Sequence, residues 1–260
     1  MRKGIKLSAI SVLLIFVCVV FFRQQYVVPI LMYHSVSPEA RKENRLSVSE
    51  KTFERQMRFL KERKYKVLPL EELAALIKEK KKIPSRAVAI TFDDGYKNNY
   101  TYAFPILKKY NLAATIFIII NEVGRRQDDR LSWQEIKVMT DSGLISIGSH
   151  TLGPEPLINI KSEREIRRQI SESKKILEAK LGCPVVVFSY PEGRFNDKIT
   201  QFVKDAGYKF AVATNPGKKI SNDDAYALKR LRVSENTGNL FTFWIQTSGF
   251  YNFIRENRKK

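Results

Sequence analysis

Two adjacent carboxylates stand directly after an apolar run of the chain. The run from Ala87 to Phe92 predicts a buried strand, and it is followed by Asp93, Asp94 and Gly95. Neighbouring strand residues point to opposite sides, but a turn at Gly95 would let both carboxylates reach one site. One carboxylate can then bind a cation while the other, kept ionised by that cation, takes a proton from water. An Asp-Gly pair that only caps a turn is the structural alternative.

Two further strand ends carry polar groups. The segment from Ile145 to Thr151 predicts a strand that ends at His150, and imidazole and carboxylate together suit a borderline metal. A third strand, Val185 to Ser189, is followed by the segment Tyr190 to Asn196. That segment could wall a substrate groove and offer a backbone N–H to an oxyanion, or it could be an ordinary Pro-Gly loop.

The chain holds two histidines, so its acid and base chemistry is restricted to few candidates. His34 follows the predicted strand Pro29 to Tyr33, which places it on the same face as Asp93, Asp94 and His150. We take His34 as a candidate general acid or orienting group. A structural histidine that packs beneath the preceding loop is an equally open interpretation.

The elements that must position these residues alternate regularly between strands and helices. Seven apolar runs predict strands at 29–33, 87–92, 113–120, 144–149, 184–189, 208–213 and 228–233. Amphipathic segments between them predict helices at 53–64, 70–82, 98–110, 133–142, 162–181 and 197–206. Such alternation implies a parallel sheet, and we expect an α/β fold with a single distorted (β/α) barrel of seven or eight strands. Chemistry in such barrels belongs at the carboxyl ends of the strands.

The N-terminal segment has the pattern of an export signal or a membrane anchor. Arg2, Lys3 and Lys6 precede the apolar run Leu7 to Phe22, and Arg23 follows it. No small-residue cleavage pattern follows the run, which favours an uncleaved transmembrane helix. We expect residues 1–25 to form the anchor and residues 26–260 to form one extracytoplasmic domain, periplasmic or at the cell surface. Cleavage of the segment would make the domain a secreted one.

The composition limits which binding partners are expected and excludes two kinds of cysteine-based structure. Two cysteines rule out a disulfide framework and a Cys-rich zinc motif. The formal net charge of +19 favours anionic surroundings such as acidic lipid or cell-wall polymers. Because the basic residues are spread over most predicted helices, we expect no nucleic-acid binding. We expect the protein to be a monomer.

Four ordered motifs resemble those of the polysaccharide deacetylase family, also called the NodB homology domain or carbohydrate esterase family four. They are Thr91 to Gly95, Ser149 to Thr151, Tyr190 to Gly193 with Asn196, and the segment around Trp133. The opening segment, 29–36, is similar to the branch that deacetylates poly-N-acetylglucosamine in biofilm matrices.

The resemblance implies a role for each matching residue. Asp93 would be the general base, and Asp94 and His150 would hold a divalent metal, for which zinc is the expected ion. The substrate groove would be lined by Trp133, Tyr190, Pro191, Gly193 and Asn196, with the Tyr190 amide facing the tetrahedral intermediate. Tyr96 adds an aromatic face that can stack on a sugar.

The sequence departs from the family pattern at two chemical positions. The second motif usually continues to another metal-binding histidine four or five residues on, whereas Glu155 stands here, and we hypothesise that Glu155 is the third metal ligand. The histidine acid that the family carries near its last strand is absent from Arg230 to Ser234. His34 is therefore our candidate for the missing acid.

The expected function is a metal-dependent hydrolase that removes N-acetyl groups from an extracytoplasmic polysaccharide of the N-acetylglucosamine type. One alternative is a catalytically impaired, membrane-tethered descendant that binds glycans without turnover. A second alternative is glycoside hydrolysis, in which Glu155 or Glu192 would pair with Asp93 or Asp94 across the scissile bond.

Overall fold

The structure is a computed structural model that describes residues 17, 21, 26–125, 129–214 and 224–257. The anchor expected at residues 1–25 lies outside this described part, apart from Val17 and Phe21. Within the described part, no helix is both long enough and apolar enough to cross a bilayer. The anchor therefore stays a prediction.

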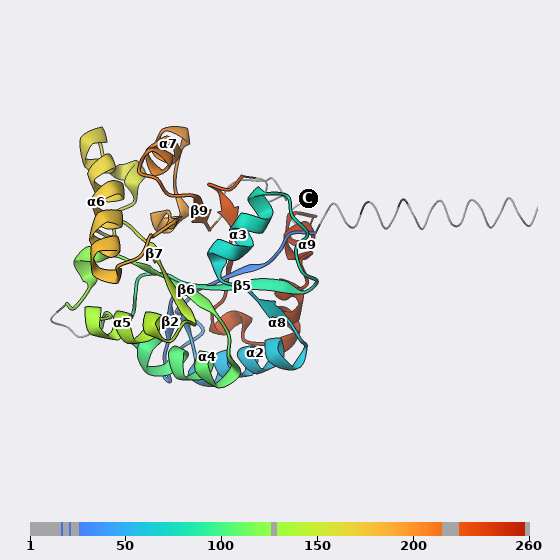
Figure 1. Cartoon of the computed structure of the whole chain (residues 1–260). Coiled ribbons are helices and arrows are strands. Elements are labelled where there is room, and N and C mark those ends of the chain that lie inside the picture. Colours follow the sequence, from blue (N-terminus) through green and yellow to red (C-terminus); the bar gives the residue numbers. More distant parts are fainter. Residues whose placement is uncertain (1–16, 18–20, 22–25, 126–128, 215–223, 258–260) are drawn as a thin grey trace, which may run out of the picture.

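Parallel strands form the centre of the molecule (Figure 1). Their bounds are β1 (Ile30–Tyr33), β5 (Ala87–Phe92), β6 (Ala114–Ile118), β7 (Ile145–Ser149), β8 (Val187–Ser189), β9 (Phe210–Ala213), β10 (Leu228–Lys229) and β11 (Leu231–Arg232). They are joined in the order β10-β9-β8-β7-β6-β5-β1-β11, and β4 (Lys66–Val67) adds to β5. A separate short pair is formed by β2 (Ser35–Val36) and β3 (Ser47–Val48).

The sheet closes on itself through one interrupted strand. β10 and β11 are separated by Arg230 alone, yet β10 pairs with β9 and β11 pairs with β1 at the other end of the strand order. The segment 228–232 thus bridges the two edges, and the predicted distorted (β/α) barrel is confirmed. All seven predicted strand positions are occupied.

Helices surround the strands and occupy the segments that the amphipathic pattern predicts. The α-helices are α2 (Glu50–Glu62), α3 (Leu70–Lys78), α4 (Phe104–Tyr110), α5 (Trp133–Asp141), α6 (Glu163–Leu181), α7 (Asp197–Asp205), α8 (Leu240–Thr247) and α9 (Tyr251–Asn257). A π-helical turn, η1 (Asn99–Ala103), leads into α4, and single 3₁₀ turns lie at η2 (Ile120–Glu122), η3 (Leu157–Asn159), η4 (Pro191–Gly193) and η5 (Glu235–Thr237). Polar caps mark the start of several helices, as where the Ser132 hydroxyl accepts from the Glu135 amide and the Glu135 carboxylate accepts from the Ser132 amide.

The strand β5 shows how the alternation of side chains aims chemistry into the barrel. Val88, Ile90 and Phe92 pack in the layer between strands and helices, whereas Ala87 and Ala89 belong to the inner cluster. Asp93 continues the inner series, so its carboxylate reaches the mouth of the barrel. The period of the strand therefore decides which of the two adjacent carboxylates is buried.

The barrel interior is filled by side chains. Phe117 of β6 lies against Gly148 of β7, where a Cβ atom would come within 2.4 Å of the Phe117 ring. The guanidinium of Arg230 lies 5.3 Å from the centroid of the same ring. Gly148 thus makes room for the ring beneath the site.

Candidate active site

The polar residues of the predicted site meet at the carboxyl ends of the strands. His34 follows β1, Asp93 and Asp94 follow β5, and His150 follows β7. Arg230 joins them from the break between β10 and β11. Both histidines are buried, with exposed fractions of 8% for His34 and 5% for His150.

The carboxylate of Asp93 is held by two hydrogen bonds from one guanidinium. Arg230 donates from Nη1 to Oδ1 at 2.6 Å and from Nη2 to Oδ2 at 2.7 Å. Arg230 also donates to the hydroxyls of Thr91 at 3.3 Å and Ser189 at 2.9 Å. Both charged side chains are buried, so this bidentate pair is a rigid internal part of the site.

The electrostatic environment keeps Asp93 ionised. Burial alone would raise the pKa of its carboxyl, but Arg230 and His150 outweigh burial and lower the pKa to about 2. Each carboxylate oxygen keeps a lone pair beyond the one that accepts from Arg230, and a water molecule can donate to it. Asp93 can therefore act as an oriented proton acceptor.

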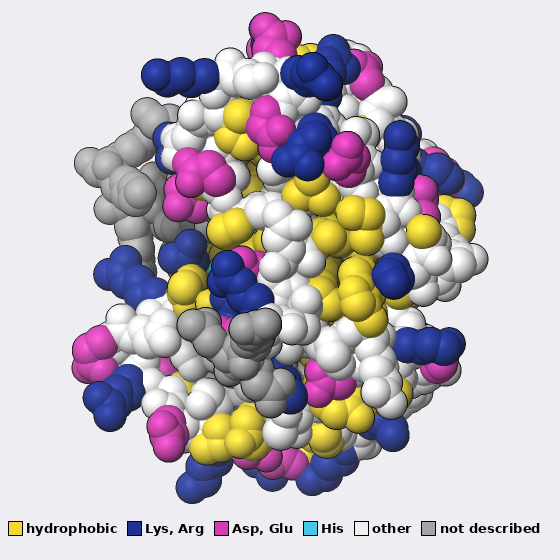
Figure 2. All heavy atoms as spheres, turned by 90° about the vertical axis from the view of Figure 1, so that its left-hand side faces the viewer, with side chains coloured by type: hydrophobic (Ala, Val, Ile, Leu, Met, Phe, Trp, Pro, Cys, Tyr) yellow, Lys and Arg dark blue, Asp and Glu magenta, His cyan; other side chains and the backbone are white. Residues whose placement is uncertain are grey.

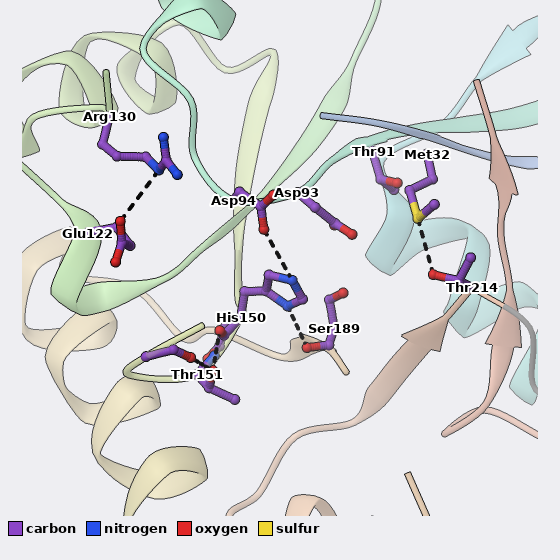
Figure 3. A network of polar contacts seen from close by, with 12 residues as sticks. Met32, Thr91, Asp93, Asp94, Glu122, Arg130, His150, Thr151, Ser189 and Thr214 are labelled. Atoms are coloured by element: carbon purple, nitrogen blue, oxygen red, sulfur yellow. Dashed lines mark hydrogen bonds and ion pairs between the residues drawn. The ribbon is translucent and has the colours of Figure 1, made fainter. Parts of the chain in front are cut away.

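Asp94 turns away from its neighbour and faces the second histidine. Its φ of +67° lies in the left-handed region, so the backbone leaves the extended conformation after the end of β5. Asp94 Oδ1 lies 3.5 Å from His150 Nε2, and His150 Nδ1 lies 2.8 Å from the carbonyl oxygen of Ser189 (Figure 3). The adjacent residues Asp93 and Asp94 thus contact two different partners, Arg230 and His150.

The hydrogen bonding of His150 leaves its outer nitrogen facing the Asp94 carboxylate. A carbonyl oxygen only accepts, so Nδ1 carries a proton toward Ser189. In the neutral imidazole, Nε2 then presents a lone pair to another acceptor, Asp94 Oδ1. A cation between the two would satisfy both atoms, and the backbone bond to Nδ1 is the orienting contact that metal-binding histidines use. Asp94 and His150 therefore fit two ligands of a divalent metal.

The third predicted ligand is not brought to this pair. Glu155 is exposed, and its Oε1 accepts from Asn159 Nδ2 at 2.8 Å. Among the described residues, no three side chains of His, Cys, Asp or Glu are grouped so as to hold a metal ion. The predicted set of Asp94, His150 and Glu155 is thus reduced to its first two members, because Glu155 lies in a surface segment after the strand end.

His34 lies in the electrostatic field of both carboxylates. Burial lowers the pKa of its imidazole, while Asp93 and Asp94 act in the opposite direction. Its Nδ1 atom is buried and has no hydrogen-bond partner among the described residues. A purely structural histidine is normally satisfied by its neighbours, so this atom favours a functional interpretation.

The segment that follows β8 packs into the core and pairs with β9. The Tyr190 ring is fully buried against Phe195, with centroids 4.4 Å apart, and its amide donates to the Val212 carbonyl at 3.2 Å. The predicted groove wall and oxyanion donor are therefore not available from Tyr190 in this structure. The reason is that β8 continues its pairing with β9 past the expected strand end.

Neighbouring residues of that segment are also structural. Pro191 is buried, and Gly193 approaches the residue after β9 so closely that a Cβ atom would lie 2.6 Å from the Thr214 nitrogen. Asn196 caps α7 by accepting from the Ile199 amide at 2.9 Å. The predicted substrate-binding roles of Pro191, Gly193 and Asn196 thus find no support in their contacts.

The two remaining predicted groove residues differ in their surroundings. The Tyr96 ring lies beneath the Arg130 guanidinium at 4.1 Å, and burial together with Asp94 raises the pKa of its hydroxyl. Tyr96 therefore borders the site. Trp133 is half-buried at the start of α5, with Lys180 Nζ 5.7 Å from its ring, and no described contact joins it to Asp94 or His150.

Sequence reasoning missed the residues that hold the predicted ones in place. Arg230 lies within the run 228–233 that is predicted to be a strand, and a charge in a buried strand requires a partner, so its position was a usable signal. Ser189 carries no such signal in the sequence. Its carbonyl meets His150 and its hydroxyl meets Arg230 only because the pairing of the strands brings them together. Arg130 contacts the buried Glu122 at 3.7 Å near the Asp94–His150 pair (Figure 3).

The family of the chain follows from a comparison with protein families. A model described as polysaccharide deacetylase matches residues 80–211, which include Asp93, Asp94 and His150. The chain belongs to the polysaccharide deacetylase family. The family and enzyme class predicted from the motifs are thereby confirmed.

Relatives of this deacetylase-family chain cover most of its length. YxkH of Bacillus subtilis (strain 168), which is named for the same family, is 36% identical over 84% of this chain and 76% of its own. A poly-beta-1,6-N-acetyl-D-glucosamine N-deacetylase of Staphylococcus aureus (strain MRSA252) is 33% identical over 73% of this chain and 69% of its own.

A solved structure of the same fold supports the assignment. The deacetylase PplD of Streptococcus pyogenes, in complex with acetate, is 29% identical, with a TM-score of 0.73 over 81% of this chain and 93% of its own. The parallel barrel described above is therefore the fold of a family with solved members.

Proposed function

We propose that this protein hydrolyses the N-acetyl amide of an N-acetylglucosamine-type polysaccharide. The observation that carries the proposal is the buried Asp93, which Arg230 orients beside the facing pair of Asp94 and His150. A base and a cation-binding pair on adjacent residues suit the attack of water on an amide carbonyl. The relative that acts on poly-beta-1,6-N-acetyl-D-glucosamine supports that substrate class.

The reaction begins when Asp93 accepts a proton from the attacking water. The water oxygen forms a bond to the acetyl carbon, and the carbonyl oxygen takes the negative charge of a tetrahedral species. Arg230 keeps the carboxylate fixed during this step because both of its oxygens are engaged. When bound at Asp94 and His150, a divalent metal, with zinc as our proposal, supplies a Lewis acid for that charge.

The second step breaks the carbon–nitrogen bond. A proton must reach the leaving nitrogen, after which the amine of the sugar and acetate separate. His34 is our proposed donor, since its buried Nδ1 has no other partner in the described chain and the imidazole interacts with both carboxylates. Asp93 can return the proton it accepted if His34 only orients the substrate.

The proposal is tested by acetate release from soluble β-1,6-linked N-acetylglucosamine oligomers, with free amines measured in parallel. Wild-type protein with added zinc should release acetate and amine in equal amounts. His34→Gln should lower turnover at least about tenfold and leave zinc binding unchanged if His34 donates the proton. Unchanged turnover would remove His34 from the mechanism.

A specific observation favours a second candidate, a glycan-binding descendant without turnover. The described part of the chain offers a metal only two grouped ligands, which is fewer than the three protein ligands that catalytic zinc sites use. This candidate predicts binding of the oligomers with no acetate release at any metal concentration. The release of shortened sugars would instead indicate glycoside hydrolysis.

We also propose an extracytoplasmic location, held by the apolar segment Leu7 to Phe22 with its basic flanks. The face drawn in Figure 2 supports a partner other than nucleic acid, because Lys and Arg are interspersed there with Asp and Glu. Protease treatment of sealed inside-out membrane vesicles tests the location, because an extracytoplasmic domain lies inside such vesicles and should be cut only after they are opened with detergent. A domain that is cut in the sealed vesicles would lie on the cytoplasmic side and would contradict the proposal.

A further inference from the structure

An exposed aromatic groove lies between α2 and α8, and no residue of the candidate active site lines it. We call it the α2–α8 groove. It has a volume of about 490 Å³ and is lined by Phe59, Arg63, Tyr65, Arg86, Leu240, Phe241 and Trp244. Phe241 and Trp244 keep exposed fractions of 64% and 50%, although exposed large apolar side chains in a cluster are uncommon on soluble proteins.

The groove carries positive charge and no carboxylate in its lining. The arginines Arg63 and Arg86 are both exposed, and Arg86 Nη1 donates to the Arg63 carbonyl at 2.8 Å. The exposed lysines Lys64, in the turn after α2, and Lys66, the first residue of β4, flank Tyr65 of the groove in the sequence. Aromatic side chains bordered by arginine and lysine match the interface between bilayer and water, where rings lie at headgroup depth and cations meet anionic lipid.

The same end of the barrel receives the chain from its N-terminal segment. Tyr26 packs on Phe250 with ring centroids 5.7 Å apart, and the Val27 amide donates to the Gly249 carbonyl at 2.8 Å. Gly249 permits this contact, because a Cβ atom there would lie 2.2 Å from the Tyr26 ring. The entry point of the chain is thus fixed against the turn between α8 and α9.

Contacts connect this entry point to the groove. Tyr65 of the groove lies 3.1 Å, hydroxyl to hydroxyl, from Thr247 at the end of α8. Gly249, which holds the entry point, is two residues after Thr247. The apolar stretch that ends at Phe22 is four residues before Tyr26, a chain length of at most about 14 Å. A bilayer that holds the stretch is therefore within reach of the groove.

We propose that the α2–α8 groove rests on the surface of an anionic lipid bilayer. This inference rests on the proposed anchor and goes beyond the proposed chemistry. The amino ends of the strands then lie toward the membrane, and the carboxyl ends with Asp93 and His150 point away from it. The domain is held in one orientation, with its site open to polymer that lies outside the membrane.

The test uses the full chain in vesicles and the emission of single tryptophans, since the chain has two. Trp133→Phe leaves Trp244 as the reporter, and Trp244→Phe leaves Trp133 as the matched control. In vesicles of phosphatidylglycerol and phosphatidylcholine brominated near the headgroup, we expect at least a twofold loss of Trp244 emission with a blue shift. Trp133 emission should be unchanged.

The charge contribution is tested in the same assay. Arg63→Gln with Arg86→Gln should reduce the quenching of Trp244 in anionic vesicles and have a smaller effect in purely zwitterionic ones. Lys180→Gln, which lies by Trp133, is the matched control and should change neither signal.

Three results would overturn the inference. They are equal Trp244 emission with brominated and ordinary lipid, a Trp244 shift caused by sugar oligomers without lipid, and a shift that depends on protein concentration without lipid. The second would indicate a glycan surface, and the third would indicate contact between two copies. Acetate release is measured on soluble oligomers, so failure of the proposed chemistry is distinguished from failure of this orientation.

Discussion

Asp93 and Asp94 are adjacent in the sequence, yet they occupy opposite environments. Asp93 is buried and receives two hydrogen bonds from Arg230. Asp94 is partly exposed, and its partner is His150 at 3.5 Å. The half proposed to supply the base thus has its partner within the protein, whereas the half proposed to bind a cation has only two grouped ligand candidates among the described residues. Arg230 thus fixes the proposed proton acceptor, whereas the proposed cation would have to complete the other half.

The largest expected effect comes from removing the base. Asp93→Asn keeps the shape of the side chain but removes its ability to take a proton, so kcat for acetate release should fall about 10²- to 10⁴-fold. Zinc binding, measured by calorimetry, should be retained because the proposed cation ligands are Asp94 and His150. Loss of zinc binding in this variant would show that the two halves are not separate.

Removing the partner of that base should be the largest effect on stability. Arg230→Met leaves Asp93 buried without a counter-charge and should cost about 3–5 kcal/mol in free energy of unfolding, measured by urea denaturation. Arg168→Met is the matched control, since Arg168 forms an exposed pair with Glu165 and its loss should change the midpoint little. Equal shifts for the two variants would contradict the buried-pair assignment.

A double variant tests whether the loss of stability comes from the unpaired charge of Asp93. Asp93→Asn with Arg230→Met removes both buried charges, and its stability should exceed that of Arg230→Met alone. Turnover should stay as low as in Asp93→Asn. A double variant less stable than either single one would show that the pair is not the source of the coupling.

Zinc affinity is expected to depend on the two proposed ligands, Asp94 and His150. Asp94→Asn or His150→Ala should weaken zinc binding at least about tenfold, as measured by calorimetry on the folded variants. Glu155→Ala serves as the control, because its exposed carboxylate accepts from Asn159 and should leave the affinity unchanged. Weaker binding in Glu155→Ala would restore the three-ligand hypothesis.

The smallest effect is the dependence of stability on acid. The pKa of Asp93 is about 2 in the folded protein, below the ordinary value of 3.8, so the folded state binds fewer protons than the unfolded state between these values. The stabilisation is fully present above about pH 4 and is lost as the pH falls toward 2. Tm measured from pH 6 to 2 should fall less steeply in the double variant of Asp93 and Arg230 than in the wild type.

Much of the fold was open to prediction because strands and helices leave periodic patterns. The seven apolar runs all form strands, and the amphipathic segments all form helices. The interruption of the last strand was not visible, since the run Leu228 to Val233 reads as continuous. Only closure of the barrel shows that Arg230 stands at the break and turns inward to Asp93.

The candidate site was predicted in part. His34, Asp93, Asp94 and His150 are all at the carboxyl ends of strands, as the order of elements requires. Glu155 was predicted from its spacing after His150 and Asn196 from its motif, but neither signal tells where a loop turns. The turn after β7 leaves Glu155 on the surface, and Asn196 caps a helix.

The sequence by itself determined the barrel, the family and the strand ends that carry the chemistry, because these depend on local periodicity and on short motifs. The tertiary structure decided the partners: Arg230 for Asp93, the Ser189 carbonyl for His150, and Phe250, in the turn between α8 and α9, for Tyr26. Such pairings join residues far apart in the chain. They arise only when strands close in register and bring distant side chains to the same end of the barrel.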